Sequence, residues 1–517
     1  MKPTLAEAGA LPNVDREMAK GALWMVLARL SDRVIGLVST IVLVRLLAPD
    51  DFGLVAMGTS VIAVCEVLGK LGLDVALIQN REASRDHYDT AWTVGMIFST
   101  VTALFIAGAA VPAANFYGEA RLSTILYALA LGSLISGFEN IGIVAFRKNL
   151  QFNKEFQFIF GKKLAGFIVA LPLAWILQSY WALIAGIVAS RLAGVALSYA
   201  MERYRPTWSL KAMRELFHFS KWMALHSLCA TFNSRAADFV VGKFAGARDL
   251  GIFNVSYEIS NLPTSELVAP INRAVFPGYA LKASDTFLLK RSYLDVLGMI
   301  AACGTPIGVG ISVTAYLIVP LLLGDKWIAA TPLVALLGLY GVLSVLRSNA
   351  HYVFLAQGKP EIATSLGLIQ VGVFAPALVA LSISYGALGA AYAYFLSEVA
   401  LTAASFTFLS GALDIAVREI VAVVWRPLLA ATGMYIVVQL TTPPVAAAAL
   451  DLSSLLLRLG TAALAGSAAY VTILFSLWSL SARPLSAEAH ILRNTRSVKA
   501  KVFGWFEGVS TFYRLGR

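Results

Sequence analysis

Long apolar stretches alternate with short polar loops along most of the 517 residues. Each stretch holds roughly 20 residues or more, the length that a helix needs to cross the hydrocarbon core of a bilayer. The pattern therefore predicts an all-α, polytopic membrane protein with about 14 transmembrane helices. The predicted spans lie at about 20–47, 54–79, 91–113, 122–146, 157–177, 181–201, 217–242, 251–280, 295–320, 330–356, 362–384, 387–409, 420–441 and 456–480.

Lys and Arg are distributed unequally over the loops between these stretches. An even number of spans places both termini on one side of the membrane. The loops on that side hold 25 Lys and Arg residues, whereas the opposite loops hold 4. Because cytoplasmic loops carry the basic excess, both termini are predicted to be cytoplasmic. The same asymmetry accounts for the net charge of +11 without a nucleic-acid partner.

Composition agrees with a lipid environment. Hydrophobic residues make up 58% of the chain and charged residues 14%, with a mean hydropathy of +0.74. A soluble domain carries about 25% charged residues. The three cysteines all lie in apolar stretches, and the five histidines are scattered, so neither set gives a metal-ligand spacing. No metal and no cofactor is expected.

One short motif occurs twice. Segment 45–54 returns as 243–252, with an offset of 198 residues that pairs Gly53 with Gly251. Two related, strongly apolar halves are typical of membrane transporters with a site between the halves. Because six spans separate the two copies, the halves have the same orientation and form a parallel repeat.

The expected architecture is two six-helix halves around a central cavity, plus two extra helices. The basic tail interleaves Phe503, Trp505, Phe506 and Phe512 with its basic residues, which favours an amphipathic interfacial helix, with a disordered tail as the alternative. The predicted parts are an N-terminal half (1–201), a C-terminal half (202–410), spans thirteen and fourteen (411–480) and a basic cytoplasmic tail (481–517).

Charged residues inside the apolar stretches are candidates for function, because a charge at membrane depth must face a cavity, a partner or the interface. They concentrate in spans one, two, seven and eight, which begin each half. Arginine and lysine at depth suit a phosphate group. The candidates for binding an anionic group are Arg29, Arg33, Lys221, Arg235 and Arg273. The acidic candidates for a coupling proton or sodium ion are Asp32, Glu66, Asp74, Asp238 and Glu258.

A second interpretation of these charges is local neutralisation. Asp32 is next to Arg33, and Arg235 precedes Asp238 by three residues, so each pair could be a structural ion pair. The sequence leaves both interpretations open.

The sequence contains no catalytic constellation. There is no glycine-rich phosphate loop with Lys-Ser or Lys-Thr, so ATP hydrolysis through a Walker motif is excluded. The predicted extracytoplasmic loops are short, which disfavours a membrane glycosyltransferase or polymerase. We therefore expect a transporter driven by a gradient or by exchange, not an enzyme.

Three segments resemble a known family. Residues 42–53, residues 71–79 and the loop 147–152 are similar to the polysaccharide transport family of the MOP flippase superfamily, the Wzx-type exporters of O-antigen and exopolysaccharide. The resemblance covers spans one to twelve. It implies an undecaprenyl-diphosphate-linked oligosaccharide as substrate, moved from the cytoplasmic to the periplasmic leaflet of a bacterial inner membrane.

Segment 32–36 and Arg45 also resemble the first helix of the lipid II flippases in that superfamily. There a basic residue that matches Arg33 belongs to the cavity that receives the lipid diphosphate. A second cavity arginine of that family falls at Ser39, so the whole charge pattern does not transfer.

Two alternatives to a flippase stay open at this point. A cation-coupled small-molecule antiporter of the multidrug type would share the fold, but it would need an acidic site for its cationic substrates. A glycosyltransferase or polymerase of the same pathway is the other alternative. A polysaccharide polymerase and export machinery are the expected protein partners of a flippase.

Overall fold

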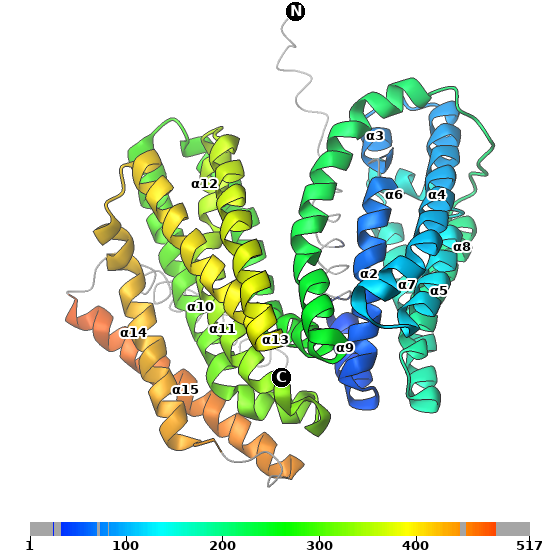
Figure 1. The fold of residues 1–517 in the computed structure, drawn as a ribbon. Helices are drawn as coiled ribbons and strands as arrows, with labels where there is room; N and C mark the ends of the chain where they lie inside the picture. The colour runs from blue at the N-terminus through cyan, green and yellow to red at the C-terminus, as the bar shows by residue number, and fades with distance from the viewer. Residues whose placement is uncertain are drawn as a thin grey trace, which may run out of the picture. The chain divides into compact units, whose positions relative to one another are not determined.

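The computed structural model describes residues 24, 31, 33–69, 73–80, 82–444 and 451–481. This part of the chain is built from α-helices, two short 3₁₀ helices and connecting turns, with no strand. Its contacts group into two compact units, Met1–Asn254 and Val255–Arg517. Figure 1 shows the helices of both units, and each unit is described by itself.

The first unit is a bundle of long helices. Helix α7 packs on α8, α4 on α5, α5 on α8, and α2 on both α4 and α5. Residues 33–46 are helical as well. The other elements of this unit are α2 (Pro49–Gly69), α3 (Leu73–Gln79), α4 (Arg85–Tyr117), α5 (Arg121–Ser136), η2 (Ile141–Ile143), α6 (Val144–Lys148), α7 (Phe152–Leu177), α8 (Trp181–Met201) and the first part of α9 (Met213–Lys282).

Small residues allow α7 and α8 to approach closely. A β-carbon placed on Gly166 would lie 2.9 Å from the carbonyl oxygen of Gly186, and one on Gly186 would lie 2.7 Å from Cβ of Ala170. Helices in membranes associate through such close packing, because lipid gives no hydrophobic drive between them.

The two copies of the repeated motif touch each other in the first unit. A β-carbon on Gly53 would overlap the carbonyl oxygen of Ala247, and one on Gly251 would overlap the carbonyl oxygen of Pro49. Both members of each contact are shifted by the same 198 residues, so the two contacts are reciprocal. Only glycine fits at either position without moving the backbone.

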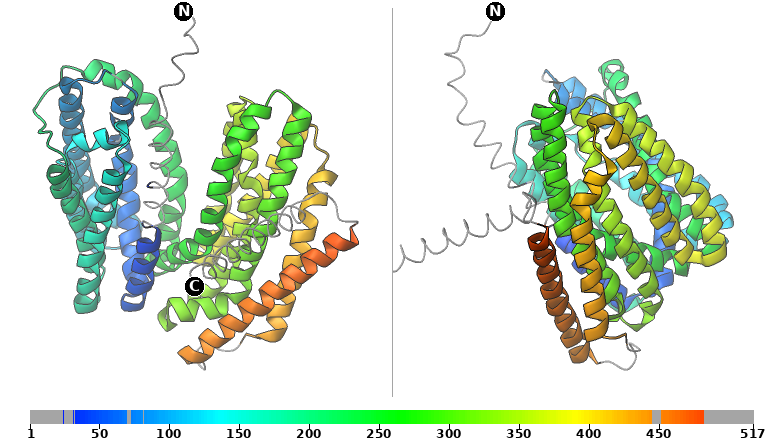
Figure 2. Two further views of the ribbon diagram at one scale, coloured as in Figure 1. Left: turned by 180° about the vertical axis from the view of Figure 1, so that it is seen from behind. Right: turned by 90° about the vertical axis from the view of Figure 1, so that its left-hand side faces the viewer.

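The second unit has its core between α10, α11, α14 and α15. Helix α10 packs on α11 and α14, α11 on α13, and α14 on α15; α14 and α15 are the orange helices that run along one side of this unit in Figure 2. Besides the rest of α9, its elements are α10 (Thr286–Leu322), η3 (Asp325–Ala330), α11 (Thr331–Ser348), α12 (Ala350–Ala356), α13 (Pro360–Leu413), α14 (Val417–Thr441) and α15 (Leu452–Leu480).

Every predicted span from 91–113 onward falls mostly on helical backbone in the described residues, and span four is interrupted at 137–140. Two pairs of predicted spans join into one long helix with a non-helical residue between them, at Gly246 in α9 and at Gly386 in α13. Predicted span four is bent by 66° between Arg121–Ser136 and Ile141–Lys148. The breaks at Gly246 and Gly386 therefore fall between predicted apolar stretches, whereas the bend after Ser136 falls inside one.

Eight helices in the described residues are long and apolar enough to span a membrane, or up to nine if the bent pair counts as one span. One of them, Thr364–Leu413, is 50 residues long and contains the break at Gly386, so it has the length of two crossings. The number of fourteen spans stays a prediction, as do the boundaries of the two halves. The predicted tail (481–517) lies almost wholly outside the described residues.

Candidate functional site

Some of the predicted site residues lie outside the described part of the chain. Arg29 and Asp32 do so entirely, and the side chain of Lys221 in α9 does so as well. Arg33 is described and exposed on the helix 33–46. One turn further, a β-carbon on Gly36 would lie 3.2 Å from Nζ of Lys163, so this helix faces a second cation from α7.

The candidates in α9 divide between the two units. Arg235 and Asp238 belong to the first unit, where Nη1 of Arg235 lies 3.2 Å from Oδ2 of Asp238. Asp238 is buried, with only 4% of its surface exposed. Glu258 and Arg273 belong to the second unit, and both are exposed. The structure thus pairs Arg235 with Asp238, as the local-neutralisation interpretation expects.

Glu66 lies in a cluster that joins three helices of the first unit. Its Oε1 accepts a hydrogen bond from Nη2 of Arg191 at 2.7 Å and another from Oγ of Ser133 at 2.9 Å. The other terminal nitrogen of Arg191, Nη1, is buried without a hydrogen-bond partner in the described structure. Glu66 is therefore bound to a cation from α8, which the sequence analysis did not single out.

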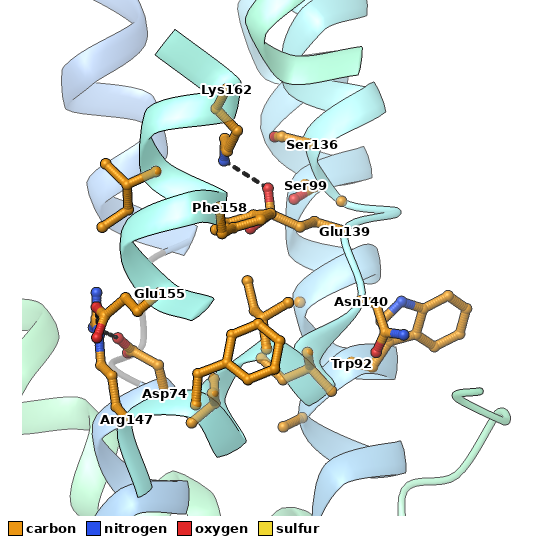
Figure 3. Close-up of a pocket in the computed structure, with 18 of the residues that line it drawn as sticks. Asp74, Trp92, Ser99, Ser136, Glu139, Asn140, Arg147, Glu155, Phe158 and Lys162 are labelled. Carbon is orange, nitrogen blue, oxygen red and sulfur yellow. Dashed lines mark hydrogen bonds and ion pairs between the residues drawn. The ribbon is translucent and has the colours of Figure 1, made fainter. Parts of the chain in front are cut away.

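A cavity of about 710 Å³ lies wholly inside the first unit. It is lined by residues between Ala91 and Ser99 of α4 and between Glu155 and Lys163 of α7, by the bent segment between α5 and α6, and by single residues of α3 and α8. Figure 3 shows the side chains that line it. Among the predicted candidates that the structure describes, Asp74 lines this cavity.

Two ion-pair clusters form part of the cavity wall. Arg147 contacts both Glu155, in a short hydrogen bond, and Asp74, whose Oδ2 lies 3.8 Å from Nη1. Nζ of Lys162 lies 2.7 Å from Oε2 of Glu139. In Figure 3 the Asp74, Arg147 and Glu155 side chains lie together, separate from the Lys162–Glu139 pair.

Asn140 holds the bend that shapes the cavity. This buried side chain accepts a hydrogen bond from the backbone nitrogen of Gly142 at 2.9 Å and donates one to the carbonyl oxygen of Tyr204 at 2.6 Å. Its own backbone nitrogen donates to Oγ of Ser198 at 2.9 Å. Asn140 therefore ties the break after α5 to the end of α8 and to the loop that follows it.

The loop after α8 is fastened to the start of α4. The hydroxyl of Tyr204 donates a short hydrogen bond to Oδ1 of Asp89, and Oγ1 of Thr207 donates to Oδ2 at 2.8 Å. Burial, together with the hydrogen bond to Asp89, raises the pKa of Tyr204 well above its usual range. The phenol stays protonated and keeps donating at any physiological pH.

The sequence analysis missed most of the cavity residues. Glu155 lies in a predicted loop, Glu139 and Lys162 lie inside the predicted spans 122–146 and 157–177, and each finds its partner in another segment of the chain. Neither hydropathy nor local spacing identifies such partners. Within the described residues no group of three or more His, Cys, Asp or Glu side chains is arranged to hold a metal ion.

Comparison with known proteins gives consistent matches over most of the chain. Residues 42–332 match a family described as "Polysaccharide biosynthesis protein". Lipopolysaccharide biosynthesis protein WzxC of Escherichia coli (strain K12) is 25% identical over 415 residues, which cover 79% of this chain and 84% of that protein. Teichuronic acid biosynthesis protein TuaB of Bacillus subtilis (strain 168) is 22% identical over 360 residues, covering 68% and 74%.

The fold is also found among solved structures. Lipid II flippase MurJ in an inward closed conformation aligns with a TM-score of 0.71 at 11% sequence identity. The alignment covers 89% of this chain and 100% of that chain. At this identity the likeness shows a shared fold.

Proposed function

Since the chain belongs to the polysaccharide biosynthesis protein family, we propose that it is a flippase for lipid-linked oligosaccharides. This membership confirms the resemblance of its motifs to the polysaccharide transport family of the MOP flippase superfamily. The substrate is an oligosaccharide on undecaprenyl diphosphate, which moves from the cytoplasmic to the periplasmic leaflet of a bacterial inner membrane by alternating access.

The polar cavity inside the first unit carries this proposal. Its wall combines charged side chains with α4 and α7, helices that are apolar enough to span a membrane. Charge at membrane depth is costly and is kept where it faces a cavity or a partner. A polar cavity within a spanning bundle suits a protein that carries a hydrophilic group through lipid.

The names of the relatives support a step that is common to the biosynthesis of different polymers. One is named for lipopolysaccharide biosynthesis and another for teichuronic acid biosynthesis. These are different polymers, so the similarity of the proteins is better explained by a shared transport step than by one particular glycosyl transfer. Transfer across the membrane is such a step.

The proposed diphosphate site consists of basic side chains from both halves of the repeat. Arg33 is the principal contact, because it has the family resemblance and a planar fork that binds phosphate with two hydrogen bonds. The supporting residues are Arg29, Lys221, Arg235 and Arg273. A coupling proton or sodium ion is proposed for one of Asp32, Glu66, Asp74, Asp238 or Glu258.

The direct test is flipping by the purified chain. In vesicles that contain the full chain and lipid-linked oligosaccharide with a labelled sugar, the label should become accessible to a reagent on the opposite leaflet. Cells without the gene should lose the surface polymer and accumulate the lipid-linked precursor. Unchanged polymer and unchanged accessibility of the label would reject the proposal, and gained resistance to cationic drugs would favour the antiporter instead.

A further inference from the structure

We propose that the cavity of the first unit binds the sugar portion of the substrate and not its diphosphate. This inference rests on the proposed flippase function and goes further, because it assigns a separate site to the oligosaccharide. The cavity of about 710 Å³ falls within the 300–1,000 Å³ range of small-molecule pockets.

The charge balance of the wall disfavours an anionic ligand. Six ionisable side chains line the cavity, and three are acidic and three basic, so their formal charges cancel; they are Asp74, Glu139, Glu155, Arg147, Lys162 and Lys163. A diphosphate placed here would meet three carboxylates and would have to compete with Glu155 and Glu139 for Arg147 and Lys162. Charge does not draw an anion into such a site.

The same wall suits a neutral ligand with many hydroxyl groups. A sugar hydroxyl both donates and accepts, so it can donate to a carboxylate while it accepts from the paired ammonium or guanidinium. Hydrogen bonds to charged groups are stronger than those between neutral groups. Ser99 and Ser136 add neutral hydroxyl groups to the wall.

Aromatic rings form one part of the apolar wall of the cavity. Trp92 from α4 and Phe158 from α7 both line it, and Nζ of Lys162 lies 5.0 Å from the centre of the Phe158 ring. Aromatic rings provide flat apolar surface, against which the C–H face of a sugar ring can pack. Rings together with paired charges match a carbohydrate, whereas neither feature favours a diphosphate.

The cavity also lies where an incoming sugar is available. Its lining comes from the beginnings of α4 and α7 and from the segment that ends at Lys148. The loops 81–90 and 147–155 next to these ends belong to the basic set predicted to be cytoplasmic. Lipid-linked precursors carry their sugars on this side before they are flipped.

Gly95 offers a way to fill the cavity without disturbing its charges. It lines the cavity, and a β-carbon placed on it meets no atom within 4 Å. Gly108 lies on the same helix outside the cavity, and a β-carbon there also meets no atom within 4 Å. Gly95→Leu should therefore obstruct the cavity, while Gly108→Leu is the matched control for a leucine on α4.

The experiment measures binding of two lipids to the full chain in nanodiscs. One is undecaprenyl diphosphate without sugar, and the other is the lipid-linked oligosaccharide extracted from cells that lack the gene. Gly95→Leu should weaken binding of the sugar-bearing lipid by about tenfold or more, as expected when added side-chain volume excludes a ligand. Binding of undecaprenyl diphosphate should change by less than about twofold, and Gly108→Leu should change neither.

A second pair of variants removes a negative charge in place of filling space. Glu139→Gln breaks the pair with Lys162 in the cavity wall, and Glu119→Gln breaks the exposed pair with Arg121 outside it. Only Glu139→Gln should weaken binding of the sugar-bearing lipid selectively. Glu139→Gln and Gly95→Leu should both weaken binding of the sugar-bearing lipid and spare undecaprenyl diphosphate. A misfolded variant would instead lose binding of both lipids.

The possible outcomes separate the two proposals. Equal losses for both lipids, or no loss for either in both cavity variants, would overturn the sugar site while the flippase proposal stands. If the unmodified chain binds neither lipid, the proposed function fails and the sugar site fails with it.

Discussion

Glu66 and Arg191 illustrate how single charges are kept in this apolar chain. The pair lies between α2 and α8, and the side chains are 24% and 19% exposed. Ser133 supplies a further hydrogen bond from α5. Because the acid already has a cation partner in this structure, a coupling ion at Glu66 would have to displace Arg191.

Removal of one partner should therefore destabilise the first unit. Arg191→Met leaves Glu66 without a counter-charge and should lower the free energy of unfolding by about 3 kcal/mol. The double variant Glu66→Gln with Arg191→Met should recover much of that loss. Thermal unfolding in detergent measures both, with Arg121→Met at the exposed Glu119 pair as the control, expected to cost less than about 1 kcal/mol.

Arg33 gives a second prediction at this scale. Arg33→Ala should reduce polymer export severely and Arg33→Lys only partly, because lysine keeps the charge but loses the two-pronged hydrogen bonding of guanidinium. If Arg33 served only to neutralise Asp32, the double change Arg33→Ala with Asp32→Ala would restore export. Surface polymer from complemented cells decides this, and full export by the double variant would contradict the substrate contact.

At the scale of elements, the break in α13 depends on one glycine. Gly386 has φ 57° and ψ −134°, a conformation open to glycine and costly for other residues. It separates the two apolar stretches that the sequence analysis had placed at 362–384 and 387–409. A single glycine therefore breaks the helix between the two stretches, without a longer connecting loop.

Gly386→Ala should destabilise the second unit by about 1–3 kcal/mol, because alanine is strained at this backbone conformation. Gly411→Ala is the matched control in the same helix, since a β-carbon there meets no atom within 4 Å. Alanine is the better helix former, so the control should be neutral or stabilising by up to about 1 kcal/mol. Equal melting temperatures of the two variants would contradict a specific role for Gly386.

Helix positions could be predicted from the sequence much better than helix partners. Hydropathy located the apolar stretches, because each must match the thickness of the bilayer. It could not show that Arg191 meets Glu66, 125 residues away, or that Lys162 meets Glu139. Those contacts depend on which face of each helix turns inward, and a stretch that is apolar on all sides does not encode that.

For the whole molecule, the distribution of basic residues predicts the orientation. The loops on the side of the termini hold 25 Lys and Arg residues against 4 on the other side. A reporter that is active only in the cytoplasm should therefore be active when it is fused after Arg517. A reporter that is active only in the periplasm should be active when it is inserted near Gly118. A periplasmic C-terminus would mean that the number of spans is odd.

The reciprocal contact of Gly53 and Gly251 has a consequence for how the two copies of the motif can diverge. In two identical copies facing each other, one mutation would alter both contacts at once, whereas in the fused chain each glycine can change alone. Gly53→Ala or Gly251→Ala should each cost about 1–3 kcal/mol by forcing backbone apart.

The two costs should not add. Once either alanine has separated the segments, the other meets less resistance, so the double variant should be more stable than the sum of the single losses predicts. Unfolding measurements on the four proteins of this cycle test the point, and strict additivity would show that the contacts are independent. The repeat thus constrains its two glycines as a pair. Once one glycine has been replaced in evolution, replacing the other should cost less stability.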